Sequence, residues 1–167
     1  FAMISIDGSS NIKALNASGK SSENSSAINL RNNGIKYIKP EMPDAITIPG
    51  AVSGWSLLHK EHGYMPWNEI FQPAINYAKS GIIVHERVAY DWAKNKEKLL
   101  ADKDTSEIFL NNNKPFNVTE NFKNIRLSKT FETIASEGAI GFYNGWVAED
   151  MLEKLHSIGG YHTKNDF

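Results

Sequence analysis

The chain has 167 residues, 41% of them hydrophobic and 22% charged, which is close to the average of a globular domain or a piece of one. Because 18 basic residues balance 19 acidic ones and cysteine is absent, the composition argues against a nucleic-acid-binding protein and excludes disulfides and a cysteine nucleophile. No apolar run approaches the roughly 18 residues that a transmembrane helix requires, so we expect no membrane-spanning segment.

Strand and turn signals dominate the N-terminal part of the sequence. Residues 1–7 and 12–16 are rich in strand formers and flank a turn-forming stretch, so we expect a β-hairpin there. The serine-rich residues 18–26 predict a loop, followed by a short helix over 27–32. Three prolines make residues 37–49 extended or irregular. The sequence begins inside a strand-like run and ends without polar chain, so we expect residues 1–167 to be an internal part of a longer protein.

From residue 49 onward the pattern is helical, because apolar residues recur at helical spacing between prolines and glycines. We expect helices over 50–62, 66–81 with a kink at Pro73, 86–101, about 127–137 and 146–157. A short turn is expected near 106–110. Trp55 and Phe131 are expected on the buried faces of their helices. The sequence thus predicts an α+β chain that is mostly α-helical, with edge strands in residues 1–17 and a helical layer over 49–167.

Several short motifs follow one another at characteristic spacings. They are Pro49-Gly50 with Val52 and Gly54, Met65-Pro66-Trp67, Pro73-Ala74-Ile75 through Gly81, Leu127 and Thr130 through Gly138, Phe142-Tyr143-Asn144-Gly145, and Gly159-Gly160 with Thr163 and Asp166. In this order they resemble the large subunit of the gamma-glutamyltransferase (gamma-glutamyltranspeptidase) family of N-terminal-nucleophile hydrolases, and within it the transferase-like and acylase-like branch. The glycines and prolines have local structural reasons, so the motifs identify a scaffold and no reactive group.

The resemblance implies a fold and a reaction for the complete protein. The fold would be a four-layer αββα sandwich of the Ntn-hydrolase type. The enzyme would be a zymogen that cleaves itself autocatalytically and exposes a Thr nucleophile on a separate small subunit, the partner of this chain. It would be a glutathione hydrolase-like enzyme that hydrolyses gamma-glutamyl or related acyl amides, or an acyltransferase. Residues 1–167 would hold no catalytic residue and be inactive alone; homo-oligomerisation stays open. The alternative is a non-catalytic helical scaffold or binding module of an inactive homologue.

The candidate substrate-binding residues are Lys20 and Ser18. In the family, an Arg in the loop after the second strand pairs with the substrate's α-carboxylate, because its planar fork binds a carboxylate bidentately. The corresponding loop here, residues 16–22, has Lys20 and no Arg. Lys20 can attract a carboxylate as a point charge; the alternative is that it is a solvated loop lysine.

No cofactor or metal site is expected. His59 and His62 stand three residues apart on a predicted helix, a spacing at which two histidines could share a metal ion. No third ligand is adjacent in sequence. We therefore interpret them as side chains near a helix C-terminus, where a cationic group is favourable.

Overall fold

The computed structural model describes all residues 1–167 and divides into two compact units: unit 1 comprises Phe1–Glu69 and Thr133–Phe167, and unit 2 comprises Ile70–Glu132. Unit 1 holds β1 (Ala2–Ser5), β2 (Ile12–Leu15), α1 (Ala27–Asn32), the 3-10 helix η1 (Pro43–Ala45), α2 (Ala51–His62), α9 (Trp146–Ser157) and the 3-10 helix η2 (Lys164–Asp166). Unit 2 holds α4 (Gln72–Ser80), β3 (Ile82–Ile83), α5 (Glu86–Lys94), α6 (Lys96–Leu100), α7 (Lys103–Phe109), β4 (Leu110–Asn111), β5 (Lys114–Pro115) and β6 (Asn121–Phe122). Two helices include residues of both units, α3 (Trp67–Ile70) and α8 (Ile125–Tyr143).

The N-terminal hairpin forms as predicted. Strands β1 and β2 pair antiparallel, with Ala2 opposite Leu15 and Ser5 opposite Ile12. The turn between them includes Asp7 and Gly8, whose φ angles of 52° and 69° lie in the left-handed region. This region favours Gly and tolerates Asp, so the local sequence determines the turn. The sheet has only these two strands, and both outer edges are unpaired.

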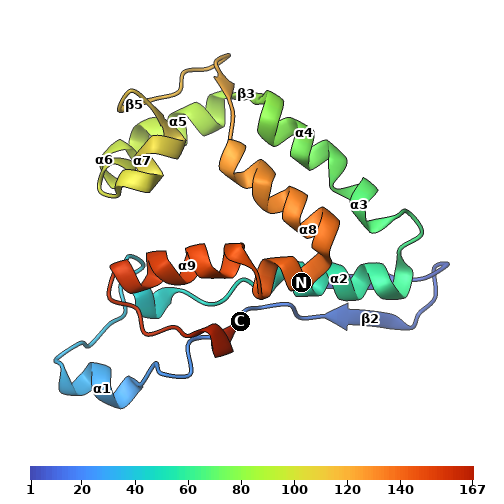
Figure 1. Ribbon diagram of the computed structural model, residues 1–167, viewed down its shortest axis with the longest axis horizontal. Coiled ribbons are helices and arrows are strands. Elements are labelled where there is room, and N and C mark those ends of the chain that lie inside the picture. Colours follow the sequence, from blue (N-terminus) through green and yellow to red (C-terminus); the bar gives the residue numbers. More distant parts are fainter. The chain divides into compact units, whose positions relative to one another are not determined.

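The core of unit 1 is built on α2, the last part of α8, and α9, which Figure 1 shows in the same half of the drawing as β2. Its buried apolar residues include Ile48, Val52, Ile134, Ala135, Phe142, Val147, Ala148 and Leu155. The prediction for Trp55 is wrong, because 44% of this residue is exposed. The buried side of α2 is instead marked by Val52 and Gly54, where another segment approaches the helix backbone closely.

Helix α8 is interrupted at Gly138, as the sequence predicts. Gly138 has φ 69° and ψ −158°, a conformation that L side chains rarely adopt, so the regular helix ends there. A further helical turn follows and carries Phe142, which is buried, and Tyr143, which is half-buried. The break therefore redirects the chain before it delivers Tyr143 to its contacts in unit 1.

Unit 2 is organised around an aromatic cluster. The ring of Trp92 on α5 lies 5.9, 5.6 and 4.9 Å from the rings of Phe109, Phe116 and Phe122. These separations are in the range of favourable edge-to-face and tilted ring pairs. Because the four rings come from α5, α7, the segment after β5, and β6, the cluster joins most of this unit.

Two helix predictions in unit 2 need correction. The helix expected over 86–101 is divided at Asn95 into α5 and α6. The turn expected near 106–110 is the end of α7, which spans Lys103–Phe109. The side chain of Asp102 accepts a hydrogen bond from the N–H of Thr105 (2.9 Å) and caps the start of α7. The Asp at residue 102 was the available sequence signal for this helix.

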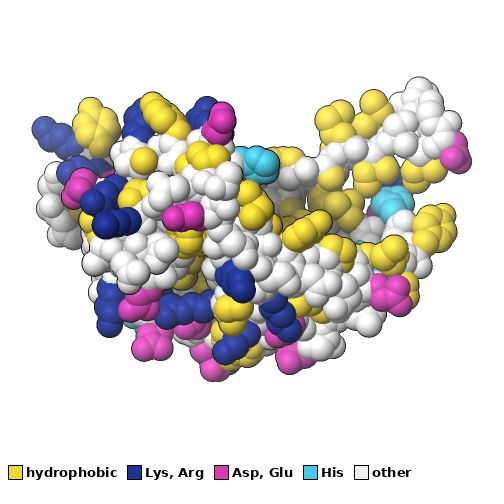
Figure 2. Space-filling model, turned by 90° about the horizontal axis from the view of Figure 1, so that it is seen from above, with side chains coloured by type: hydrophobic (Ala, Val, Ile, Leu, Met, Phe, Trp, Pro, Cys, Tyr) yellow, Lys and Arg dark blue, Asp and Glu magenta, His cyan; other side chains and the backbone are white.

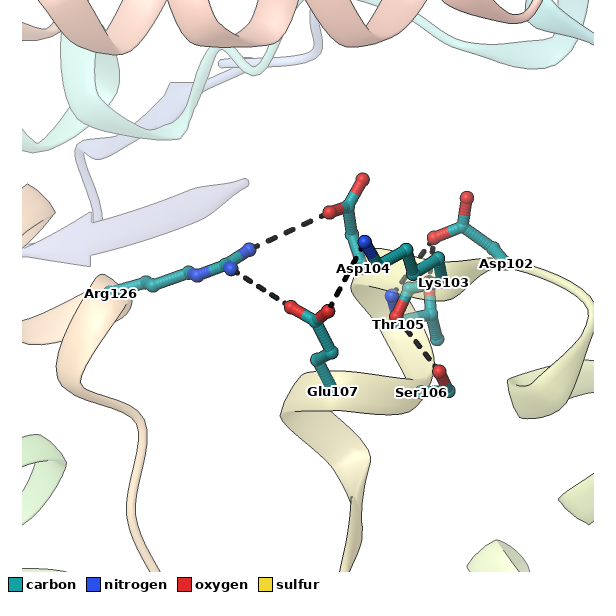
Figure 3. Close-up of polar contacts among 7 residues, drawn as sticks. All are labelled: Asp102, Lys103, Asp104, Thr105, Ser106, Glu107 and Arg126. Atoms are coloured by element: carbon teal, nitrogen blue, oxygen red, sulfur yellow. Dashed lines mark hydrogen bonds and ion pairs between the residues drawn. The ribbon is translucent and has the colours of Figure 1, made fainter. Parts of the chain in front are cut away.

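An exposed network of charges connects α7 to the first turn of α8. Figure 3 shows the guanidinium group of Arg126 reaching Glu107 (3.1 Å) and Asp104 (3.8 Å), while Lys103 lies 3.9 Å from Glu107. Exposed ion pairs of this kind contribute little to stability individually. The network pairs Arg126 and Lys103 with the acidic side chains of α7.

The surface mixes apolar and charged side chains. Figure 2 shows hydrophobic, basic and acidic side chains interspersed on the visible face. Among the exposed apolar residues are Phe1 and Met3 on the hairpin and Tyr77 and Ile83 in unit 2. None of the helices combines the length and the apolar character needed to cross a bilayer.

Candidate functional site

A pocket of about 330 Å³ lies in unit 1, where the loop after β2 meets the first turn of α2. Its lining consists of residues 15–20, 48–50, Ser53, Gly54, Leu57, Tyr143, Asp166 and Phe167. Both residues that the sequence singled out, Ser18 and Lys20, are exposed and belong to this lining. The structure therefore brings the two candidate residues to one pocket.

Glycines allow the loop to rest directly on α2. A Cβ atom added to Gly50 would lie 2.4 Å from the carbonyl oxygen of Ala17, and one added to Gly54 would lie 2.5 Å from the Cβ of Ala17. Both distances are shorter than a van der Waals contact, so only glycine permits this approach. The N–H of Ile48 also donates a hydrogen bond to the carbonyl oxygen of Lys20 (2.9 Å). Gly50 and Gly54 thus allow the loop of residues 16–22, which we call the Lys20 loop, to pack directly on α2.

The only charged side chains in the lining belong to Lys20 and Asp166. The ammonium group of Lys20 makes no hydrogen bond or ion pair in the structure. Such a group attracts an anion that enters the pocket, and a carboxylate is a suitable partner for it.

Asp166 has a structural role, because its carboxylate already accepts hydrogen bonds from protein groups. It is only 2% exposed. The N–H groups of Glu23 (2.8 Å) and Thr163 (2.6 Å) donate to it, as do the hydroxyls of Ser22 and Thr163, each at 3.3 Å. Burial by itself raises the pKa of Asp166, but these four hydrogen bonds outweigh it and hold the pKa below its ordinary value. Asp166 therefore stays ionised and holds the far end of the Lys20 loop.

Tyr143 connects α8 to the start of α2. Its hydroxyl donates a hydrogen bond to the carbonyl oxygen of Pro49 (2.6 Å) and accepts one from the N–H of Ser53 (3.0 Å). Burial raises the pKa of the Tyr143 hydroxyl, against a smaller opposing effect of the Ser53 N–H. The hydroxyl therefore remains protonated and able to donate.

Tyr143 and Asp166 belong to the sequence motifs, but the sequence gives neither of them a place in the pocket. For Tyr143 no local signal exists, because its partners lie 90 and 94 residues away. For Asp166 the spacing from Thr163 is that of a capping box, which the structure contains at η2. That spacing could have identified Asp166 as a structural carboxylate.

Of the two histidines of α2, only His59 has a hydrogen-bond partner. The Nε2 of His59 is hydrogen-bonded to the carbonyl oxygen of Met65 (2.7 Å), and its ring packs edge-on against Trp67. The Nε2 of His62 lies 3.5 Å from the carboxylate of Glu61. No three His, Asp or Glu side chains in the structure are arranged to hold a metal ion.

The fold is that of N-terminal-nucleophile hydrolases. It superimposes on the gamma-glutamyltranspeptidase of Helicobacter pylori with a TM-score of 0.89 and 26% identity, over 99% of this chain and 48% of that one. It also superimposes on the cephalosporin acylase of Bacillus halodurans with a TM-score of 0.89 and 24% identity, over 98% of this chain and 32% of that one.

The family follows from the sequence match. Residues 1–167 match the model of the family described as gamma-glutamyltranspeptidase, and the chain belongs to that family. It is 31% identical over 164 residues to the glutathione hydrolase-like YwrD proenzyme of Bacillus subtilis, a match that covers 93% of this chain and 30% of that protein. Three of its curated relatives are covered to 23%, 20% and 30% of their length, so the chain spans less than a third of each.

Proposed function

We propose that the protein to which residues 1–167 belong hydrolyses gamma-glutamyl or related acyl amides, or transfers the acyl group to another amine. Membership in the gamma-glutamyltranspeptidase family supports this reaction class. One observation supports the pocket as the substrate-binding site. The ammonium group of Lys20 is unpaired there, whereas Asp166, the other charged side chain of the lining, already accepts hydrogen bonds from protein groups.

The reaction needs a nucleophile from outside this segment. An N-terminal Thr combines a hydroxyl with a free α-amine that serves as its base, whereas every Thr within the segment has an amide nitrogen. In the proposed reaction the Thr hydroxyl attacks the amide carbon, the amine leaves with the proton, and an acyl ester forms. Water or an amino acid then attacks the ester and restores the Thr. We expect the small subunit to supply this Thr and residues 1–167 alone to be inactive.

While the small subunit supplies the nucleophile, Lys20 would bind a carboxylate of the acyl group. A charge-assisted hydrogen bond of this type contributes about 1.5–3 kcal/mol. Because an ammonium group is a point charge and lacks the fork of a guanidinium, it binds a carboxylate without demanding bidentate geometry. A site with a lysine would therefore accept carboxylate-bearing acyl groups other than gamma-glutamyl.

The test compares Lys20→Ala, Lys20→Arg and Lys13→Ala in the full-length, self-cleaved protein. Lys13 lies on β2, is exposed, and does not line the pocket, so its substitution is the matched control. Lys20→Ala should lower kcat/KM for a carboxylate-bearing amide by about 10- to 150-fold, while Lys20→Arg retains activity or raises it on gamma-glutamyl substrates. Lys13→Ala should change nothing.

Two results would contradict the proposal. An unchanged kcat/KM in Lys20→Ala, on a substrate that the wild type turns over, would make Lys20 a solvated loop residue and this segment a scaffold only. A correctly cleaved protein that turns over no acyl amide would favour the non-catalytic scaffold or binding module.

A further inference from the structure

The first turn of α2 is capped from another helix. The residue that precedes α2, Gly50, has no side chain to accept hydrogen bonds from the free N–H groups of the first turn. The N–H of Ser53, the third residue of α2, donates instead to the hydroxyl of Tyr143 (3.0 Å). That hydroxyl donates in turn to the carbonyl of Pro49 (2.6 Å). One hydroxyl thus fixes the backbone on both sides of Gly50.

The backbone that Tyr143 fixes is the support of the Lys20 loop. Gly50 and Gly54 contact Ala17 at distances that no other residue type would allow. The N–H of Ile48, next to Pro49, holds the carbonyl of Lys20. The Lys20 loop packs against residues 48–54 through Ala17 and the carbonyl of Lys20. A displacement of residues 48–54 therefore displaces the loop.

We propose that Tyr143 is a positioning residue that sets the place of the Lys20 ammonium group in the pocket by fixing residues 49–53. This inference rests on the proposed function, since it takes Lys20 as the group that binds the substrate's carboxylate. Tyr143 uses its hydroxyl on the protein backbone and has no chemical role in the acyl transfer.

Loss of the hydroxyl should therefore affect binding of the carboxylate more than the chemical step. In Tyr143→Phe the ring remains, but the N–H of Ser53 and the carbonyl of Pro49 lose their partner. Two hydrogen bonds are lost, and the net contribution of each corresponds to about a three- to tenfold change in an equilibrium constant. We therefore expect KM for a carboxylate-bearing amide to rise by at least about threefold. The value of kcat should stay within about twofold.

The experiment is a double-mutant cycle in the full-length, self-cleaved protein, with Tyr143→Phe, Lys20→Ala and both together. The matched control is Tyr64→Phe, which removes the hydroxyl of a fully exposed tyrosine of unit 1 that does not line the pocket. Tyr143→Phe should raise KM in the wild-type background, and have no further effect once Lys20 is Ala. It should not change turnover of the same amide with the carboxylate converted to a carboxamide. The control should behave as wild type.

Additive effects in the cycle, or equal losses on the charged and the neutral substrate, would overturn the proposal and make Tyr143 a purely structural residue. These results differ from failure of the proposed function, which would appear as an unchanged kcat/KM in Lys20→Ala alone or as no turnover of any acyl amide by the wild type.

Hydrogen exchange provides a readout that does not depend on activity. In Tyr143→Phe, amides in residues 16–22 and 47–54 should exchange faster than in the wild type, and the same amides should be unchanged in Tyr64→Phe. Unchanged exchange in residues 16–22 of Tyr143→Phe would show that the loop is held without the hydroxyl, and would overturn the proposal whatever the kinetics.

Discussion

A methyl group at residue 54 tests how closely the Lys20 loop must approach α2. In Gly54→Ala the new Cβ would lie 2.5 Å from the Cβ of Ala17 and 3.6 Å from a methyl carbon of Leu15. Carbon atoms in contact are normally about 3.5–4.0 Å apart, so the loop and the helix must separate by about 1 Å. The neighbour that must move is the segment that carries Lys20.

Two opposing terms determine the effect on stability. Alanine favours a helix over glycine by about 1 kcal/mol, while insertion of a methyl group into a packed contact costs about 1–3 kcal/mol. The free energy of unfolding of Gly54→Ala should thus fall by about 0–2 kcal/mol. Activity should respond more strongly, because a displacement of about 1 Å at a binding group can cost up to about 100-fold in rate. We expect kcat/KM to fall about tenfold or more.

The assay measures thermal unfolding and kcat/KM of the full-length protein for Gly54→Ala, Ala17→Gly and the double variant. Removal of the Ala17 methyl should relieve the clash, so the double variant should regain most of the activity that Gly54→Ala loses. If Gly54→Ala is more stable than wild type and equally active, the loop does not rest on α2 and the reasoning is refuted.

Three further predictions concern stability. Because hydrogen bonds hold the pKa of Asp166 below its ordinary value of 3.8, its carboxylate stabilises the folded state above that value, and this contribution is lost as the pH falls through the lowered pKa. Asp166→Asn should therefore be less stable than wild type near neutral pH and should lose less stability on acidification. If the free energies of unfolding of the two proteins, measured with denaturant, depend on pH in the same way, the role of the carboxylate is contradicted. Phe131→Ala should cost about 3 kcal/mol, because its half-buried ring packs 6.3 Å from that of Phe71. Trp55→Ala should cost less, since Trp55 is 44% exposed, and the reverse order in chemical denaturation would show that the helix faces are misassigned. Residues 1–167 alone should unfold broadly and at low temperature, because β1 and β2 pair only with each other; a sharp two-state calorimetric transition would disprove this.

The helix boundaries that the sequence predicted correctly are those with a local cause. The break between α3 and α4 falls at Phe71, two residues before Pro73, which occupies the second position of α4. Gly138 interrupts α8 with a backbone conformation that favours glycine. The errors arose where tertiary contacts decide. Trp55 fits the apolar period of α2, but the packed side of that helix is set by the close approach of Ala17 to Gly54, which no periodicity reveals.

The pocket residues could likewise be predicted only where the signal is local. Lys20 and Ser18 could be predicted because they lie in one loop whose sequence resembles a known family. Tyr143 was not, because its contacts with Pro49 and Ser53 join segments about ninety residues apart. A single sequence carries no record of such contacts, although it does carry the capping-box spacing of Thr163 and Asp166.

The carboxylate of Asp166 also makes the pocket depend on both ends of the segment. Its hydrogen bond with the N–H of Glu23 joins residues 143 positions apart, so it closes a loop that contains most of the segment. Contacts of such high sequence separation cost loop entropy before they return any stabilisation. The Lys20 loop leaves the ribosome among the first residues of this segment, yet it gains its final anchor only after residue 166 has been made. The pocket is therefore completed by the last residues of the segment, and a chain interrupted before them would present Lys20 on a loop held at one end only.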